Sequence, residues 1–366
     1  MAFPITFNPT LATLPVYQPG RPIDEVARQL GMAPGDIIKL ASNENPLGPS
    51  PRALAAVQKL LPQTHLYPDG SAFHLKQKLA EKLGVTPAHL ILGNGSNEII
   101  EFAGHSVMGP GIDVVVSQYC FAIYPIIARM AGSNLITVPA RAYGHDLRAM
   151  LRAITPATRV VFVANPNNPT GTVAAREEVV ELVNGVPDHV LLVMDEAYIE
   201  FLDDAVDLLP LIRNGVRPNL VLMRTFSKIY GLAGFRVGYG IAHPEVIKTW
   251  EKVRQPFNIN APAQAAALAA LDDEEHLQRT RHNNREGFQL FARAFRELGL
   301  EFVPTPANFI LVRVGDGQQV FAALQQRGVI VRPMGGYQLP GFIRISIGTP
   351  AENHRCLAAL RESLGK

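Results

Sequence analysis

The chain has 366 residues, of which 47% are hydrophobic, so it can bury a large core and form two domains or one large domain with an appended unit. Its formal net charge of +2, with acids and bases mixed along the chain, argues against a nucleic-acid-binding surface. Two distant cysteines, an N-terminus without a signal-peptide pattern and the lack of a long apolar segment argue against a disulfide scaffold and a membrane span, and predict a cytoplasmic protein.

Residues 1–50 are rich in Pro and Gly and carry one helical pattern at 24–30, which predicts an N-terminal arm lying on the body of the protein. From 51 to 256, helical patterns alternate with short apolar runs, which predicts a large domain with a mostly parallel sheet between helices. The predicted helices are 51–61, 73–83, 97–108, 122–131, 175–183 and 244–254, and the predicted strands are 112–117, 134–138, 159–164, 189–194, 219–223 and 237–241.

The pattern changes after a long predicted helix at 275–298. The predicted strands that follow are 308–314, 329–332 and 342–347, and the predicted helices are 318–327 and 350–363. Residues 257–366 therefore form a smaller C-terminal α+β domain in this interpretation, and the N-terminal arm belongs to it. The predicted fold class is α/β, with a large and a small domain.

The segment Gly93-Asn94-Gly95-Ser96-Asn97-Glu98 opens the predicted helix 97–108. Free backbone N–H groups at a helix start, with glycines that allow close approach, can bind an anion, although Gly-rich caps are also common without one. Ser96 and Asn97 are therefore candidate phosphate ligands. The spacing matches neither a dinucleotide-binding loop nor a P-loop, which argues against a nicotinamide oxidoreductase.

Two further candidates follow predicted strands. Phe121 comes after the strand 112–117, where an aromatic residue either joins the core or stacks on a flat ligand ring. The turn Asn165-Pro166-Asn167-Asn168-Pro169-Thr170-Gly171 comes after the strand 159–164. Read alone, this turn is an ordinary loop, but its place at a strand end makes Asn168 a site candidate.

Asp195 ends the apolar run 190–194. A carboxylate at the end of a buried strand is costly unless it is paired, although a single Asp at such a place usually caps a helix or a turn. Tyr198 lies three positions later. An anion and a phenol at this spacing can face the two polar edges of a pyridine ring, with Asp195 on a protonated ring nitrogen and Tyr198 on a phenolic oxygen.

Lys228 lies on a loop after the strand 219–223, with Ser227 before it and Arg236 eight positions after it. An amine, a hydroxyl and a guanidinium beside a strand end suit a phosphorylated carbonyl compound, since the amine can form a Schiff base while the others hold the phosphate. Such a phosphate would meet Ser96 and Asn97 on its other side.

Arg332 and Arg344 lie in otherwise apolar predicted strands of the C-terminal unit. Each alone is typical of a solvated strand surface, but together they can clamp an anionic substrate. The histidines have no metal-ligand spacing, so a metal site is not predicted. No G-x-S-x-G motif is present, which argues against an α/β-hydrolase.

Together these motifs give the chain a resemblance to the fold-type-I pyridoxal-phosphate enzymes and, within them, to the histidinol-phosphate aminotransferases. The resemblance covers nearly the whole chain, and each motif is weak or moderate alone while their order is specific. In that order the motifs are L-A-S-N-E-N-P-L-G (40–48), Y-P-D-G (67–70), G-N-G-S-N-E (93–98), N-P-N-N-P-T-G (165–171), D-E-A-Y (195–198), the block 227–239 and R-I-S-I-G (344–348).

The resemblance implies roles for these residues. Lys228 would bind pyridoxal 5′-phosphate covalently and then move a proton as general base and acid, with Asp195 on the ring nitrogen. The other implied cofactor contacts are Asn168 and Tyr198 on the phenolic oxygen, Phe121 on the ring, and Ser96, Asn97, Ser227 and Arg236 on the phosphate. Tyr67 would reach that phosphate from the partner subunit of a homodimer, and Tyr17, Asn45, Arg332 and Arg344 would bind substrate.

One departure from the family pattern stands next to Phe121. The family usually has Pro and then Ser or Thr before the stacking aromatic residue, whereas this chain has Tyr119 and Cys120. The ring contact or the substrate range can therefore differ here. We expect Cys120 to be a small buried side chain rather than a nucleophile, because no activating partner is evident in the sequence.

The implied reaction converts L-histidinol phosphate and 2-oxoglutarate to 3-(imidazol-4-yl)-2-oxopropyl phosphate and L-glutamate. An aromatic amino-acid aminotransferase on the same scaffold is the nearest alternative, because one Arg can bind either a phosphate or a carboxylate. A threonine-phosphate decarboxylase-type lyase is a further alternative. A transcription regulator with an aminotransferase-like domain would need a DNA-binding helix-turn-helix, for which the short Pro-rich N-terminal region leaves no room.

Overall fold

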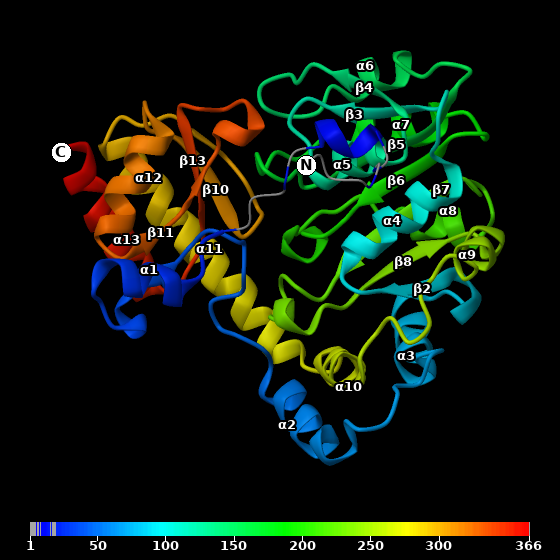
Figure 1. The fold of residues 1–366 in the computed structure, drawn as a ribbon, viewed down its shortest axis with the longest axis horizontal. Helices are drawn as coiled ribbons and strands as arrows, with labels where there is room; N and C mark the ends of the chain where they lie inside the picture. The colour runs from blue at the N-terminus through cyan, green and yellow to red at the C-terminus, as the bar shows by residue number, and fades with distance from the viewer. Residues whose placement is uncertain (1–4, 6, 8, 15, 17–19, 366) are drawn as a thin grey trace.

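The computed structural model describes residues 5, 7, 9–14, 16 and 20–365. Figure 1 shows two units, with the larger one built on a seven-stranded sheet in the order β2-β8-β7-β6-β5-β3-β4. Its strands are β2 (Leu90–Gly93), β3 (Asp113–Ser117), β4 (Asn134–Val138), β5 (Thr158–Ala164), β6 (Leu191–Asp195), β7 (Leu220–Thr225) and β8 (Gly238–Ala242). Its helices are α2 (Pro51–Leu60), α3 (Phe73–Leu83), α4 (Ser96–Val107), α5 (Ile123–Met130), α6 (Leu147–Arg152), α7 (Arg176–Gly185), α8 (Leu209–Arg213), α9 (Pro244–Trp250) and α10 (Ala261–Ala270).

Strand direction places the polar strand ends at one edge of this sheet. β4, β3, β5, β6 and β7 pair in parallel. β8 runs antiparallel to both β7 and β2, so β2 has the same direction as the parallel strands. The carboxyl ends of six strands therefore lie at a common edge, which is where ligands bind in open α/β sheets.

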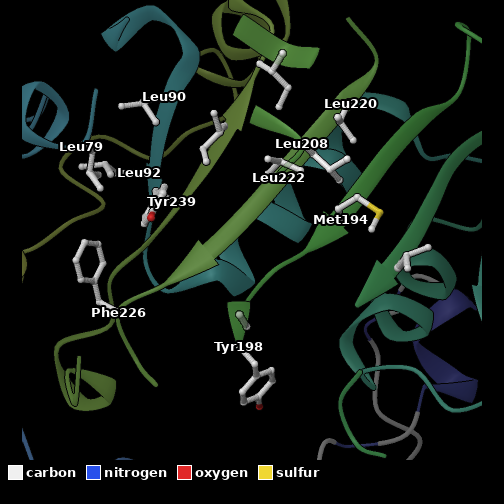
Figure 2. Packing of buried hydrophobic residues seen from close by; sticks show 14 of the residues in the cluster. Leu79, Leu90, Leu92, Met194, Tyr198, Leu208, Leu220, Leu222, Phe226 and Tyr239 are labelled. Atoms are coloured by element: carbon white, nitrogen blue, oxygen red, sulfur yellow. The ribbon is translucent and has the colours of Figure 1, made fainter. Parts of the chain in front are cut away.

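The strands are apolar on both faces because helices cover both faces. Alternate residues of β5 and β6, such as Val161 and Leu192, join the core that contains α3, α6 and α7. Their neighbours, such as Phe162 and Val193, join the core that contains α4, α5 and α9. Figure 2 shows part of the first core, with Leu222 and Met194 among the strands and Tyr198 beyond the end of β6. This two-sided burial explains the continuous apolar runs in the sequence.

The smaller unit contains a four-stranded antiparallel sheet in the order β12-β13-β10-β9. The strands are β9 (Phe302–Val303), β10 (Phe309–Arg313), β12 (Arg332–Pro333) and β13 (Phe342–Ser346), and the helices are α11 (Glu274–Glu297), α12 (Gly317–Gln326) and α13 (Pro350–Leu364). The N-terminal region, with α1 (Ile23–Leu30), adds β1 (Ile38–Lys39), which pairs in parallel with β11 (Val329–Ile330). This pairing attaches the N-terminal segment to the C-terminal unit.

The position of α10 bears on the predicted domain boundary at 256. Ala263, Ala267 and Leu271 belong to the core of the large sheet, whereas Phe291 and Phe295 of α11 belong to the core of the small unit. Figure 1 shows α11 running from α10 to the small unit. We therefore propose a boundary inside α11 rather than after Pro256, with residues 257–273 in the large domain.

The mostly parallel α/β architecture predicted from sequence is confirmed, and several elements differ in detail. β2 was not predicted, because a four-residue apolar run ending in Gly is too short to stand out. The predicted strand 329–332 is divided between two sheets, with Val331 separating β11 from β12. α6, α8 and α10 were also not predicted. Among the described residues, no helix is both long and apolar enough to cross a membrane.

Candidate active site

A cavity of about 590 Å³ lies at the carboxyl edge of the large sheet, and residues of the small unit line its other side. Its volume is typical of a small-molecule site. The residues lining it include most of the candidates from the sequence: Ser96, Asn97, Phe121, Asn168, Asp195, Tyr198, Ser227, Lys228, Arg236, Arg332 and Arg344.

Lys228 follows β7, and its amine lies within the cavity wall. Nζ donates to the backbone oxygen of Ser42 at 3.3 Å and lies 5.7 Å from the centroid of the Tyr198 ring. Burial and the nearby Arg344 guanidinium lower the pKa of Lys228 to about 8. At pH 7 about a tenth of such amines is unprotonated, far more than for an ordinary lysine, so this lysine can act as a nucleophile and as a proton carrier.

Asp195 is the last residue of β6 and is 6% exposed. Its Oδ2 accepts a hydrogen bond from Oη of Tyr124 at 2.5 Å, and its Oδ1 accepts one from the backbone nitrogen of Ala197 at 3.0 Å. Burial raises the pKa of Asp195 to about 6, while these two hydrogen bonds favour the carboxylate. The site therefore contains a largely ionised acid near neutral pH.

Tyr198 and Asn168 present a phenol and an amide to the same cavity. The Tyr198 hydroxyl accepts a hydrogen bond from Nδ2 of Asn43 at 2.9 Å. Oδ1 of Asn168 accepts one from Nη1 of Arg344 at 2.5 Å, which leaves the Asn168 amide nitrogen as its donor group. Both side chains are thus fixed by neighbours from the small unit or the N-terminal segment.

The start of α4 has the form of an anion site. Gly95 is the N-cap at φ +72°, and Ser96 and Asn97 begin the helix. A Cβ on Gly95 would overlap the Arg236 guanidinium, so the glycine allows this cation to lie against the helix start. Ser96, Asn97, Ser227 and Arg236 all line the cavity here, as the sequence predicted for a phosphate site.

We expect Gly238→Ala to weaken binding at this anion site. A Cβ on Gly238 would overlap the backbone nitrogen of Ser96 and lie 2.8 Å from the carbonyl carbon of Gly95, and backbone atoms cannot rotate away. We predict a loss of phosphate-ester affinity of about tenfold or more, because overpacking of this size costs about 1–3 kcal/mol. Gly109→Ala is the control, because its Cβ would meet nothing within 4 Å. Equal affinities of the two variants for pyridoxal phosphate would contradict this explanation.

Phe121 lines the cavity despite the unusual residues before it. Cys120 is buried among apolar side chains, and burial raises the pKa of its thiol to about 12, so it is not an activated nucleophile. Tyr119 packs instead against the small-unit cluster that contains Leu311 and Phe342. Neither residue displaces Phe121 from the cavity.

Arg332 and Arg344 are directly opposite each other in the β12–β13 pair, and both line the cavity. Arg344 is only 6% exposed, and its Nη2 donates to the backbone oxygen of Ala41 at 3.0 Å. Two guanidinium groups on one face of a ladder repel each other, an arrangement that an anionic ligand would stabilise.

Two predicted residues that the structure describes, Asn45 and Tyr67, do not line this cavity. Asn45 was predicted to bind substrate, but its amide donates to the Ile229 oxygen at 2.8 Å and to Thr280 at 3.1 Å, so it braces the loop. Tyr67 is 83% exposed and stacks on Phe257, with ring centroids 4.7 Å apart. Tyr17 lies outside the described residues.

Two contacting residues were not predicted from the sequence. Tyr124 is the partner of Asp195, and Asn43 is the partner of Tyr198. Asn43 lies in the S-N-E-N segment, two positions before the asparagine that was predicted, and its φ of +54° sets it apart from its neighbours. Tyr124 follows Phe121 by three positions, a spacing that a helical turn would have indicated.

Comparison with known families matches residues 35–360 to the model for aminotransferase class I and II. The chain belongs to the class I and II aminotransferases. This aminotransferase is 51% identical to a histidinol-phosphate aminotransferase of Akkermansia muciniphila, over 98% of each chain. It is 49% identical to histidinol-phosphate aminotransferase 2 of Pseudomonas fluorescens, over 98% of this chain and 97% of the relative.

Solved structures agree with this family assignment. The histidinol-phosphate aminotransferase of Sinorhizobium meliloti, determined in complex with pyridoxal-5′-phosphate, superposes with a TM-score of 0.91 at 32% identity, over 100% of this chain and 98% of the other. Aspartate aminotransferase of Thermus thermophilus superposes with a TM-score of 0.84, over 98% of this chain and 100% of the other, and at 24% identity this shows the shared fold alone.

The cavity of this aminotransferase fits the cofactor that the sequence resemblance implies. Lys228 offers an amine for the aldehyde, and the buried Asp195 offers an anion for the ring nitrogen. The start of α4 with Arg236 offers an anion site for the phosphate. These three groups come from different strand ends, so only the folded chain brings them together.

Proposed function

We propose that this aminotransferase moves the amino group of L-histidinol phosphate to 2-oxoglutarate, giving 3-(imidazol-4-yl)-2-oxopropyl phosphate and L-glutamate in L-histidine biosynthesis. The observation that carries this proposal is the pair Arg332 and Arg344, which supplies cations to the cavity in addition to Arg236. One anion site can then serve the cofactor phosphate and a second the substrate phosphate. The names and high identity of the curated relatives support the same substrate.

Pyridoxal 5′-phosphate, when bound, supplies an aldehyde that takes the substrate amine and a ring that stores the electrons released at the amine-bearing carbon. Lys228 would hold its aldehyde end, and Asp195 would pair with the ring nitrogen. The remaining cofactor contacts that we propose are Asn168 and Tyr198 at the phenolic oxygen, Phe121 on the ring face, and Ser96, Asn97, Ser227 and Arg236 at the phosphate.

Lys228 also has the properties of the proton carrier. The pKa of its amine, lowered to about 8, lies close to neutral pH, where a group can both accept and return a proton. Nζ would take the proton from the amine-bearing carbon of the substrate. It would deliver this proton to the former aldehyde carbon of the cofactor, which then carries the amino group. The small unit, which lines one side of the cavity, would limit access of water during this transfer.

Arg344 and Arg332 would bind the phosphate of histidinol phosphate in one half-reaction and a carboxylate of 2-oxoglutarate or glutamate in the other. A guanidinium forks onto either anion with two parallel hydrogen bonds. Asn168, held by Arg344 at 2.5 Å, would link the substrate anion to the cofactor oxygen. Asn43, rather than Asn45, is the asparagine of the N-terminal segment that reaches this region.

A comparison of substrates tests this function. We expect kcat/KM for L-histidinol phosphate to exceed that for L-phenylalanine by about 100-fold or more, because the carboxylate of L-phenylalanine carries less charge than the phosphate and lies closer to the amine-bearing carbon, so its contacts with the two guanidinium groups are weaker. Conversion of the holoenzyme to its pyridoxamine form would be followed by absorbance. Equal values would favour an aromatic amino-acid aminotransferase, and release of carbon dioxide from O-phosphothreonine without a keto acid would favour a lyase.

We also propose a homodimer with shared sites, located in the cytoplasm. The position of Tyr67 supports a homodimer with shared sites, because Tyr67 is exposed and lies away from the cavity of its own subunit. The buried free thiols of Cys120 and Cys356 are compatible with a reducing compartment.

A mixing experiment tests the shared site. Tyr67→Ala and Lys228→Ala proteins are each expected to be weak or inactive, whereas mixed dimers regain one complete site per dimer. Activity recovered on mixing and subunit exchange supports the proposal. No recovery, with hybrid dimers demonstrated by mass, would place Tyr67 outside the neighbouring site.

A further inference from the structure

We propose that Tyr124 is a positioning residue of this aminotransferase, which keeps the Asp195 carboxylate ionised and correctly oriented for the ring nitrogen of the cofactor. The inference rests on the cofactor role proposed for Asp195. Tyr124 is 0% exposed, and its hydroxyl donates to Oδ2 of Asp195 at 2.5 Å. With the backbone nitrogen of Ala197 on Oδ1, each carboxylate oxygen has one fixed donor, which sets the plane of the group.

The Tyr124 ring is held so that its hydroxyl has a single direction. It stacks on Phe162 of β5 with centroids 4.7 Å apart and planes 6° apart. Phe121 meets it edge to face at 5.7 Å. Phe121 and Tyr124 are three positions apart at the start of α5, so one turn of chain places an aromatic ring at the cavity and a phenol on the acid.

The charges around Asp195 explain why a donor is needed. Burial is the main influence on its pKa and raises it, and the Glu196 carboxylate acts in the same direction. Against these, the Tyr124 hydrogen bond is the largest favourable influence on the carboxylate, followed by that of the Ala197 backbone. Lys228, the cation that acts on this acid, contributes less than either hydrogen bond.

Tyr124 remains a donor over the whole working range. Burial and the Asp195 charge raise its pKa well above that of a free phenol, so it does not ionise near neutral pH. The other titratable groups near this pair are Cys120, whose thiol pKa is raised to about 12, and Tyr198, whose phenol pKa is also raised. Neither the Cys120 thiol nor the Tyr198 phenol ionises between pH 5 and 9, so neither takes up the proton that Tyr124 donates to Asp195.

The test is the pH dependence of cofactor affinity. For the wild-type protein and Tyr124→Phe, the dissociation constant of pyridoxal phosphate would be measured between pH 5 and 9, starting from holoenzyme. Loss of the donor raises the pKa of Asp195, so the pH below which affinity falls should move upward by about one unit. At pH 5, below both midpoints, the variant should bind the cofactor about tenfold more weakly, whereas at pH 7 the two proteins should differ by only about twofold.

Tyr239→Phe is the matched control. Tyr239 is also a buried tyrosine of the large sheet, and its hydroxyl bonds Arg224 rather than the acid. Its variant should keep the wild-type midpoint, and titration of the cofactor phosphate affects all proteins equally. An unchanged midpoint for Tyr124→Phe, or an equal shift for Tyr239→Phe, would overturn the inference.

A second variant covers the case in which Tyr124→Phe does not fold. Replacing Tyr124 by 3-fluorotyrosine keeps the ring shape and makes the hydroxyl a stronger donor, so the midpoint should move to lower pH. A midpoint at the wild-type value or above it would contradict the proposed role. If Asp195→Asn binds the cofactor as wild type does at every pH, the role of Asp195 itself fails; if only Asp195→Asn weakens binding, the inference about Tyr124 fails alone.

Discussion

Lys228→Ala is expected to lower transamination by about ten-thousand-fold, the upper range for removal of a positioned acid–base group. The variant loses both the amine that holds the cofactor and the group that carries the proton. Cofactor held by the anion site at α4 and by Asp195 should still bind, but without the absorbance of a covalent lysine adduct. Steady-state assays with L-histidinol phosphate and 2-oxoglutarate measure the loss.

Lys248→Ala is the control for this variant, because Lys248 lies on the surface with 72% of its side chain exposed. It should retain full activity. If Lys228→Ala kept more than about a hundredth of wild-type activity, the proton would have to be carried by another group, and the lysine would only bind the cofactor.

Asp195→Asn is expected to reduce kcat by about 100- to 1,000-fold, as for the removal of one preorganised charge-stabilising group. The amide keeps the size of the carboxylate and has an oxygen for the Tyr124 hydroxyl, but it carries no charge to hold a proton on the ring nitrogen. Single-turnover absorbance with saturating substrate separates this loss from weaker binding.

An exposed acid provides the comparison for Asp195. The side chain of Asp188 is 83% exposed, and Asp188→Asn should leave kcat unchanged. A kcat of Asp195→Asn within about threefold of wild type would mean that the ring nitrogen does not need an anion for this reaction, and the electrostatic account of the site would be wrong.

The sequence predicted the residues that line the cavity best where a chemically reactive side chain follows a predicted strand. Asp195 and Lys228 each follow a buried apolar run, and parallel strands bring such ends to one edge. The G-N-G-S-N-E segment was recognisable because glycines and a helix start leave backbone donors free. For these residues, the local sequence alone indicates why they lie at the cavity.

Other features depend on contacts between distant segments. The Tyr124–Asp195 bond joins residues 71 positions apart and requires α5 to lie beneath the end of β6. Asn43 and Asn45 are chemically equal in the sequence, and only the backbone of their loop decides which one faces the cavity and which one binds Ile229 and Thr280.

The domain boundary also depends on contacts between distant segments. The Ala-rich helix α10 has no strongly polar face in the sequence, so its pattern does not indicate which core it joins. In the structure its small side chains allow close packing on α2. The role proposed for Tyr67 would depend on a second subunit, and a pattern within one chain does not specify where that subunit lies.

The most direct test of the account is borohydride reduction of the holoenzyme, followed by mass spectrometry of its peptides. We expect one added reduced pyridoxyl phosphate group per chain, located on Lys228 and absent after prior conversion with L-histidinol phosphate. A protein that binds no pyridoxal phosphate, or one labelled at a different lysine, would contradict it.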